Sequence, residues 1–107
     1  MPFNFDPNQN YYLFNNNNTT PLVFIHGVGL DQTMWNPQLN YFKNETTLTY
    51  DLLGHGKTPL KNNNLSMENF TDQLYGLIKN LDINKFNLVG FSIGSLIAIE
   101  FASKYHN

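Results

Sequence analysis

The stretch that decides the fold runs Asn87-Leu88-Val89-Gly90-Phe91-Ser92-Ile93-Gly94-Ser95. It begins as a short apolar run typical of a strand, predicted over residues 86–90. It then passes through the pattern G-x-S-x-G into residues 95–104, a helix-like segment that is apolar almost all round and is therefore expected to be a buried helix. A serine lifted out of a tight strand-to-helix turn needs glycine on both sides, because side chains at Gly90 and Gly94 would collide. The order strand, G-x-S-x-G, helix therefore predicts that Ser92 is a catalytic nucleophile at the start of a buried helix.

A second glycine-bearing turn, His26-Gly27-Val28-Gly29, follows the apolar run 22–25. Acyl transfer places negative charge on a carbonyl oxygen, and backbone N–H groups aimed at that oxygen stabilise it. We expect the N–H of Ile93, the residue after the nucleophile, to be one donor and that of Val28 to be the other. Gly27 and Gly29 allow the backbone to come close without side-chain clashes. His26 is expected to have a structural role in this turn.

The elements between these turns alternate. Parallel strands are predicted near residues 22–25, 47–50 and 86–90, and helices over 33–42, 66–81 and 95–104; an antiparallel pair, 3–5 and 10–14, precedes them. Alternating strands and helices indicate the α/β class with a mostly parallel sheet flanked by helices. Strands 22–25 and 86–90 should be neighbours, because Val28 and Ile93 must converge on one oxyanion. The asparagine-rich runs 15–18 and 62–64 are expected in surface loops.

Composition narrows the function classes. The 107 residues carry a net charge of -2, 13% charged residues and no cysteine. The lysines are scattered singly, so no nucleic-acid partner is expected. No segment resembles a membrane span or a signal peptide, which favours a cytoplasmic protein. No metal-ligand set or cofactor motif is expected either.

Three segments together resemble the N-terminal signatures of the α/β-hydrolase superfamily: residues 21–27, 50–58 and 89–95. The segment 29–35 is similar to the subgroup of enol-lactonases, meta-cleavage-product hydrolases and small esterases. The resemblance implies a serine hydrolase acting on a small-molecule acyl substrate such as a carboxylic ester or a lactone. It also implies that Asp51 and His55 belong to a structural turn and are not catalytic.

The chain leaves the catalytic machinery incomplete. The resemblance places the catalytic acid and histidine after the serine, and the one histidine there, His106, is 14 residues on. That is roughly 21 Å along a helix, too far for a hydrogen bond. We therefore expect residues 1–107 to be a partial domain, the truncated N-terminal portion of the fold, inactive by itself.

Other readings stay open at this point. The chain could be a non-catalytic truncated product or a binding module. Acyl transfer to another acceptor, or cofactor-free haloperoxidase chemistry, would use the same strand-to-helix turn at Ser92. Whether the chain is an enzyme, which substrate it takes and how it assembles are left open by the sequence.

Overall fold

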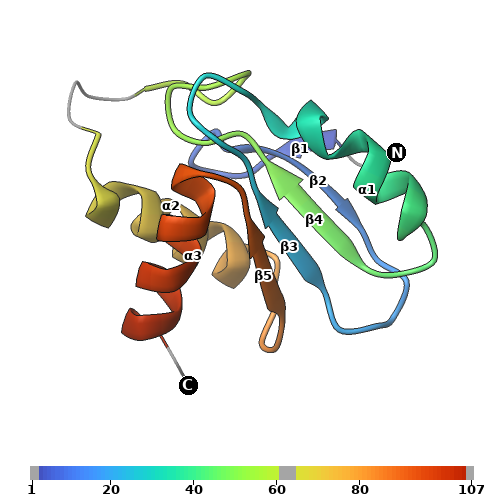
Figure 1. Cartoon of the computed structure of the whole chain (residues 1–107). Coiled ribbons are helices and arrows are strands. Elements are labelled where there is room, and N and C mark those ends of the chain that lie inside the picture. Colours follow the sequence, from blue (N-terminus) through green and yellow to red (C-terminus); the bar gives the residue numbers. More distant parts are fainter. Residues whose placement is uncertain (1–2, 61–64, 106–107) are drawn as a thin grey trace.

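The computed structural model describes residues 3–60 and 65–105. Its one described sheet has the strand order β1-β2-β4-β3-β5 (Figure 1). The strands are β1 (Phe3–Phe5), β2 (Tyr11–Asn15), β3 (Leu22–Ile25), β4 (Thr47–Tyr50) and β5 (Asn87–Gly90). Strand β3, which lies between β4 and β5, is parallel to both, while β2 is antiparallel to both β1 and β4. The predicted adjacency of strands 22–25 and 86–90 is confirmed, as is the N-terminal antiparallel pair.

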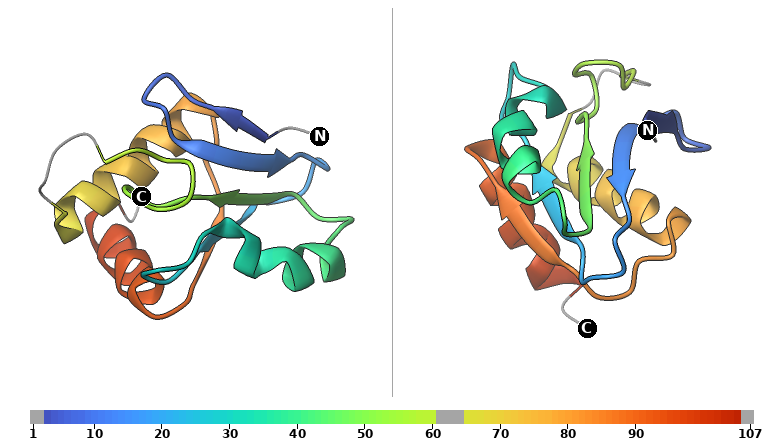
Figure 2. Two further views of the ribbon diagram at one scale, coloured as in Figure 1. Left: turned by 90° about the horizontal axis from the view of Figure 1, so that it is seen from above. Right: turned by 90° about the vertical axis from the view of Figure 1, so that its right-hand side faces the viewer.

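Helices cover both faces of the sheet. Phe24 of β3 packs against Trp35, with ring centroids 4.9 Å apart. Its neighbours Val23 and Ile25 point the opposite way, because side chains alternate along a strand, and join the main core with Leu74 and Ile97. Figure 2 shows α1 and α2 on opposite sides of β4. The result is the three-layer α/β arrangement expected from the sequence.

The first helical segment is broken into two pieces, whereas the sequence predicts one helix over 33–42. A 3-10 turn, η1 (Gln32–Trp35), leads into α1 (Asn36–Tyr41). Pro37 explains the break, because it has no N–H to donate to the carbonyl four residues earlier. The N–H of Asn36 instead bonds to the carbonyl of Thr33, the shorter 3-10 spacing.

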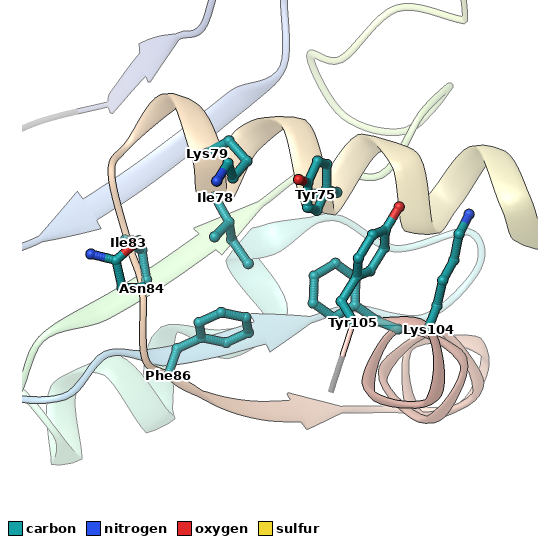
Figure 3. A pocket seen from close by; sticks show the side chains of 9 residues that line it. Tyr75, Ile78, Lys79, Ile83, Asn84, Phe86, Lys104 and Tyr105 are labelled. Carbon is teal, nitrogen blue, oxygen red and sulfur yellow. The ribbon is translucent and has the colours of Figure 1, made fainter. Parts of the chain in front are cut away.

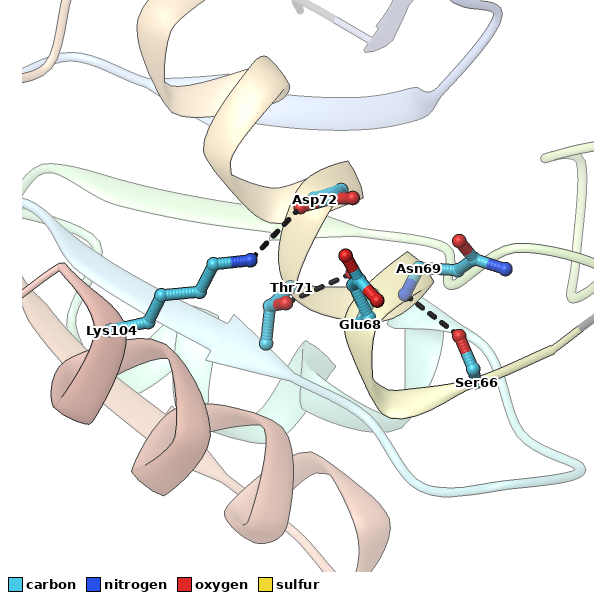
Figure 4. Close-up of polar contacts among 6 residues, drawn as sticks. All are labelled: Ser66, Glu68, Asn69, Thr71, Asp72 and Lys104. Carbon is cyan, nitrogen blue, oxygen red and sulfur yellow. Dashed lines mark hydrogen bonds and ion pairs between the residues drawn. The ribbon is translucent and has the colours of Figure 1, made fainter.

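Helix α2 (Met67–Asn80) lies in the predicted segment, with Ser66 as its N-cap. The Ser66 hydroxyl accepts a hydrogen bond from the Asn69 N–H at 3.1 Å (Figure 4). On the exposed side, Lys104 reaches Asp72 at 3.5 Å and links α2 to α3. This exposed ion pair is a weak contact; apolar packing between the helices holds them together. The loop predicted at 62–64 lies outside the described residues.

Helix α3 (Ile93–Lys104) corrects one expectation. The sequence predicts a helix buried nearly all round, yet Leu96 and Ile99 are 55% and 67% exposed, while Ile97 and Phe101 are buried. The reason is the position of β5 at the edge of the described sheet. The helix packs on β5 and α2 with one face, and no described element covers the other. It also begins two residues earlier than expected, directly after Ser92.

Candidate active site

Ser92 lies at a sharp turn between β5 and α3. Its backbone has φ 58° and ψ -122°, a strained combination for a residue with a side chain. The turn is closed by the Gly94 N–H bonded to the Phe91 carbonyl and by the Ser95 N–H bonded to the Ser92 carbonyl, both at 2.9 Å. The Ser92 residue is exposed at the N-terminus of α3. The helix end thus presents the hydroxyl beside the Ile93 N–H, which has no acceptor among the described residues, and a developing anion is favoured at such a helix end.

Gly90 and Gly94 are required by close backbone contacts. A Cβ at Gly90 would lie 2.3 Å from the Gly94 carbonyl oxygen, and one at Gly94 would lie 2.2 Å from the Ile25 carbonyl oxygen. The second contact joins the first turn of α3 to the end of β3. The Phe91 N–H also donates to the Ile25 carbonyl at 3.1 Å. Glycine at these two positions therefore lets the serine turn sit directly against the neighbouring strand.

The turn after β3 lies beside Ser92. A Cβ built on Gly27 would be 3.4 Å from Cβ of Ser92. The Gly27 carbonyl accepts a hydrogen bond from the Leu30 N–H at 3.2 Å. The close approach expected at Gly29 is wrong, because a Cβ there would meet no atom within 4 Å; glycine is favoured instead by its φ of +81°. Val28, between them, is 62% exposed. Within the described residues, neither Val28 nor Ile93 donates its backbone N–H to a protein acceptor.

His26 is fully buried and both of its ring nitrogens are engaged. Nδ1 lies 2.7 Å from the Gly27 carbonyl oxygen, and Nε2 lies 2.9 Å from the backbone nitrogen of Leu52. Since the Leu52 N–H can only donate, Nε2 is the acceptor and Nδ1 carries the proton. Burial lowers the pKa of His26, outweighing the contrary effect of the bond to Gly27, so the ring is neutral. A ring with no free nitrogen cannot take a proton from Ser92.

Asp51 has the structural role that the sequence suggests. One carboxylate oxygen accepts from the Gln32 N–H at 2.8 Å, and the other accepts from the Lys57 N–H at 2.9 Å. The carboxylate fills the space at Gly56, where a Cβ would be 2.2 Å from it. His55 bonds through Nδ1 to the Leu53 carbonyl at 3.0 Å. These contacts tie the loop after β4 to the start of η1.

A buried glutamine completes this support, and sequence reasoning misses it. Gln73 of α2 donates to the Asp51 carbonyl and to Asn10 at 3.0 Å each, and accepts from the Leu53 N–H at 3.1 Å. Gln32 similarly accepts from Thr49 at 2.7 Å. An amide on a helix face carries no signal of burial in the sequence, so this polar support becomes visible only in the structure.

In the described part of the chain, no side chain that could act as a base is hydrogen-bonded to the Ser92 hydroxyl. The Ser92 hydroxyl has no hydrogen-bond partner among residues 3–60 and 65–105. His106, the one histidine that follows Ser92 in the sequence, lies outside the described residues.

A cavity of about 500 Å³ opens between α2, α3 and the segment before β5, lined in part by the stacked Tyr75 and Tyr105 (Figure 3). It lies at the C-terminal end of α3, a 12-residue helix whose other end carries Ser92. That separation is about 18 Å along the helix axis. The cavity is thus distinct from the serine turn.

In the described part of the chain, every helix is too short or too polar to cross a bilayer.

Comparison with known proteins agrees with this fold. The chain is 35% identical over 91 residues to the (E)-2-((N-methylformamido)methylene)succinate hydrolase of Acinetobacter baylyi, covering 84% of this chain and 35% of the relative. The enol-lactonase of Burkholderia xenovorans superposes with a TM-score of 0.86 at 27% identity, over 92% of this chain and 39% of that one. An esterase of Thermogutta terrifontis gives a TM-score of 0.79 at 32% identity, over 92% and 38%.

The chain thus spans little more than a third of the length of these relatives. A family model for the alpha/beta hydrolase fold matches residues 20–107. The match includes β3, the turn at Gly27 and the whole serine turn. The chain belongs to the α/β-hydrolase family.

Proposed function

We propose that Ser92 is the nucleophile of a hydrolase that cleaves a small carboxylic ester, a lactone or a related acyl substrate. The observation that carries this proposal is the strained turn at Ser92, held against the end of β3 and beside Gly27. Strain of this kind is worth about 1–3 kcal/mol and persists where its surroundings enforce it. Here the enforcing groups are backbone atoms of the neighbouring strand. Relatives named as an enol-lactonase, an esterase and a hydrolase of a substituted succinate support the same class of chemistry.

The proposed step begins with attack of the Ser92 hydroxyl oxygen on the substrate carbonyl carbon. A base takes the hydroxyl proton as the new C–O bond forms, and negative charge gathers on the carbonyl oxygen. The backbone N–H groups of Val28 and Ile93 are the proposed donors to that oxygen. The alcohol then leaves with a proton, and water cleaves the acyl-serine to release the acid. Both N–H groups lie in turns brought together at one end of the sheet.

The base and its acidic partner are proposed to lie outside the described residues. His26 is excluded by its two hydrogen bonds. Residues 1–107 are then one part of a catalytic domain whose remaining part supplies the histidine. The 107-residue chain alone should show negligible turnover, because loss of the histidine of a serine triad lowers turnover by about 10⁶-fold in subtilisin.

Hydrolysis of p-nitrophenyl acetate by the full-length protein tests this proposal. We expect Ser92→Ala to lower turnover by at least about 10³-fold. Ser66→Ala is the matched control, because Ser66 caps α2 and is not in the serine turn. It should lower stability by about 1 kcal/mol and leave turnover unchanged. Full turnover in Ser92→Ala would refute the assignment.

A further inference from the structure

We propose that His26 is a positioning residue that sets the direction of the Val28 N–H. The inference rests on the proposed function and adds to it the group that orients one oxyanion donor. His26 touches neither the substrate nor Ser92 in this proposal. It acts through the carbonyl oxygen of Gly27, to which its Nδ1–H donates at 2.7 Å.

The peptide unit between Gly27 and Val28 links the ring to the oxyanion donor. The Gly27 carbonyl and the Val28 N–H belong to the same planar trans peptide, so they point in opposite directions. The carbonyl is held by two donors, the His26 ring and the Leu30 N–H at 3.2 Å. Fixing the carbonyl inside the turn therefore turns the Val28 N–H outward. The Ser92 side chain lies beside this turn, since its Cβ is 3.4 Å from a Cβ built on Gly27.

The His26 ring is itself held rigidly. It has no exposed surface, and its Nε2 accepts the Leu52 N–H at 2.9 Å. One side of the ring is thus anchored to the loop after β4, while the other side holds the turn at residues 26–29, called here the oxyanion turn because it contains the proposed donor Val28. The Leu52 loop is held in turn by Asp51 and Gln73. A buried ring that is held by a hydrogen bond at each nitrogen is a rigid link between the two loops.

The oxyanion turn needs such a link because its two glycines allow the backbone to adopt other conformations. Gly27 lacks a side chain and Gly29 has φ +81°. The peptide between Gly27 and Val28 could rotate and present its carbonyl to the oxyanion instead of its N–H. Loss of one oxyanion donor lowers kcat by about 10²- to 10³-fold. The His26 bond opposes this rotation.

Two substitutions separate the two bonds of the ring. An asparagine amide overlaps the Nδ1 position, so His26→Asn retains a donor for the Gly27 carbonyl and loses the acceptor for Leu52. A glutamine amide reaches the Nε2 position, so His26→Gln retains the Leu52 contact and loses the donor. We expect His26→Gln to lower kcat by about 10²-fold with KM nearly unchanged, and His26→Asn to retain kcat within about 10-fold.

The experiment measures kcat and KM for p-nitrophenyl acetate in the full-length protein, with Ser92→Ala alongside. Equal kcat values for the two His26 variants, with Ser92→Ala inactive, would overturn this inference and leave the proposed function intact. Activity that survives Ser92→Ala would overturn the proposed function itself. A measurement on the unaltered protein covers the case in which a variant does not fold. The ¹⁵N spectrum of the His26 ring should show the proton on Nδ1, and a proton on Nε2 would overturn the inference.

Discussion

Gly94→Ala should disrupt the serine turn through a direct backbone clash. The added Cβ would lie 2.2 Å from the Ile25 carbonyl oxygen and 2.8 Å from that of His26, whereas ordinary contact begins at 3.4 Å. Both opposing atoms belong to the backbone, so neither can rotate away. Helix α3 and β3 must separate by roughly 1 Å, which displaces Ser92 from the turn at residues 26–29. We expect turnover to fall by about 10²-fold and the free energy of unfolding to fall by about 1–3 kcal/mol.

The matched control is Gly76→Ala in the interior of α2. The nearest neighbouring atom there is Nδ2 of Asn8, at 3.8 Å, which is ordinary contact. Alanine in place of glycine inside a helix should raise stability by about 0.5–1 kcal/mol and leave turnover unchanged. The assay combines p-nitrophenyl acetate hydrolysis with urea unfolding of the full-length protein. A Gly94→Ala variant with the same turnover and the same free energy of unfolding as the unaltered protein would refute the steric argument.

Three further predictions concern the core and the loops beneath the site. Tyr50→Phe should raise stability by about 1 kcal/mol in urea unfolding, because the Tyr50 hydroxyl is buried without a partner among the described residues and burial raises its pKa; a loss of stability would reveal a bond for that hydroxyl. Asp51→Ala should lower stability by about 3 kcal/mol, since the N–H groups of Gln32 and Lys57 lose their acceptor; an unchanged urea midpoint would contradict the role assigned to the carboxylate. The His26 pKa is lowered from its ordinary value of 6.5, so the folded protein binds fewer protons there than the unfolded chain. Stability should therefore be full above about pH 6.5 and decline as the pH falls below it, and His26→Asn should decline less steeply; parallel profiles would assign the acid sensitivity to another group.

The sheet and the serine turn are predictable because their signals are local. A run of β-forming residues that stops at a glycine turn indicates both a strand and its carboxyl end, as at Ile25 and Gly90. Two such turns that follow neighbouring parallel strands must lie side by side at the carboxyl end of those strands. Gly90 and Gly94 can be identified for the same reason, since close backbone approach excludes side chains there, whereas the positive φ of Gly29 becomes evident only in the structure.

Other features depend on contacts that a sequence pattern does not encode. The exposure of Ile99 follows from the edge position of β5, because an apolar helix is buried only where a neighbour covers it. The buried amide of Gln73 bonds to backbone groups brought there by tertiary packing. The division of segment 33–42 depends on the hydrogen bond that Pro37 cannot donate. The sequence pattern locates these segments along the chain but does not specify their surroundings.

The most direct test of the central claim is covalent labelling of the full-length protein with a fluorophosphonate. An activated serine beside an oxyanion site reacts with this phosphorus centre and displaces fluoride, while an ordinary surface hydroxyl does not. Peptide mass spectrometry should find one adduct, on Ser92, and no adduct in the Ser92→Ala variant. Labelling that persists in Ser92→Ala, or that maps to a different residue, would contradict the assignment of Ser92 as the nucleophile.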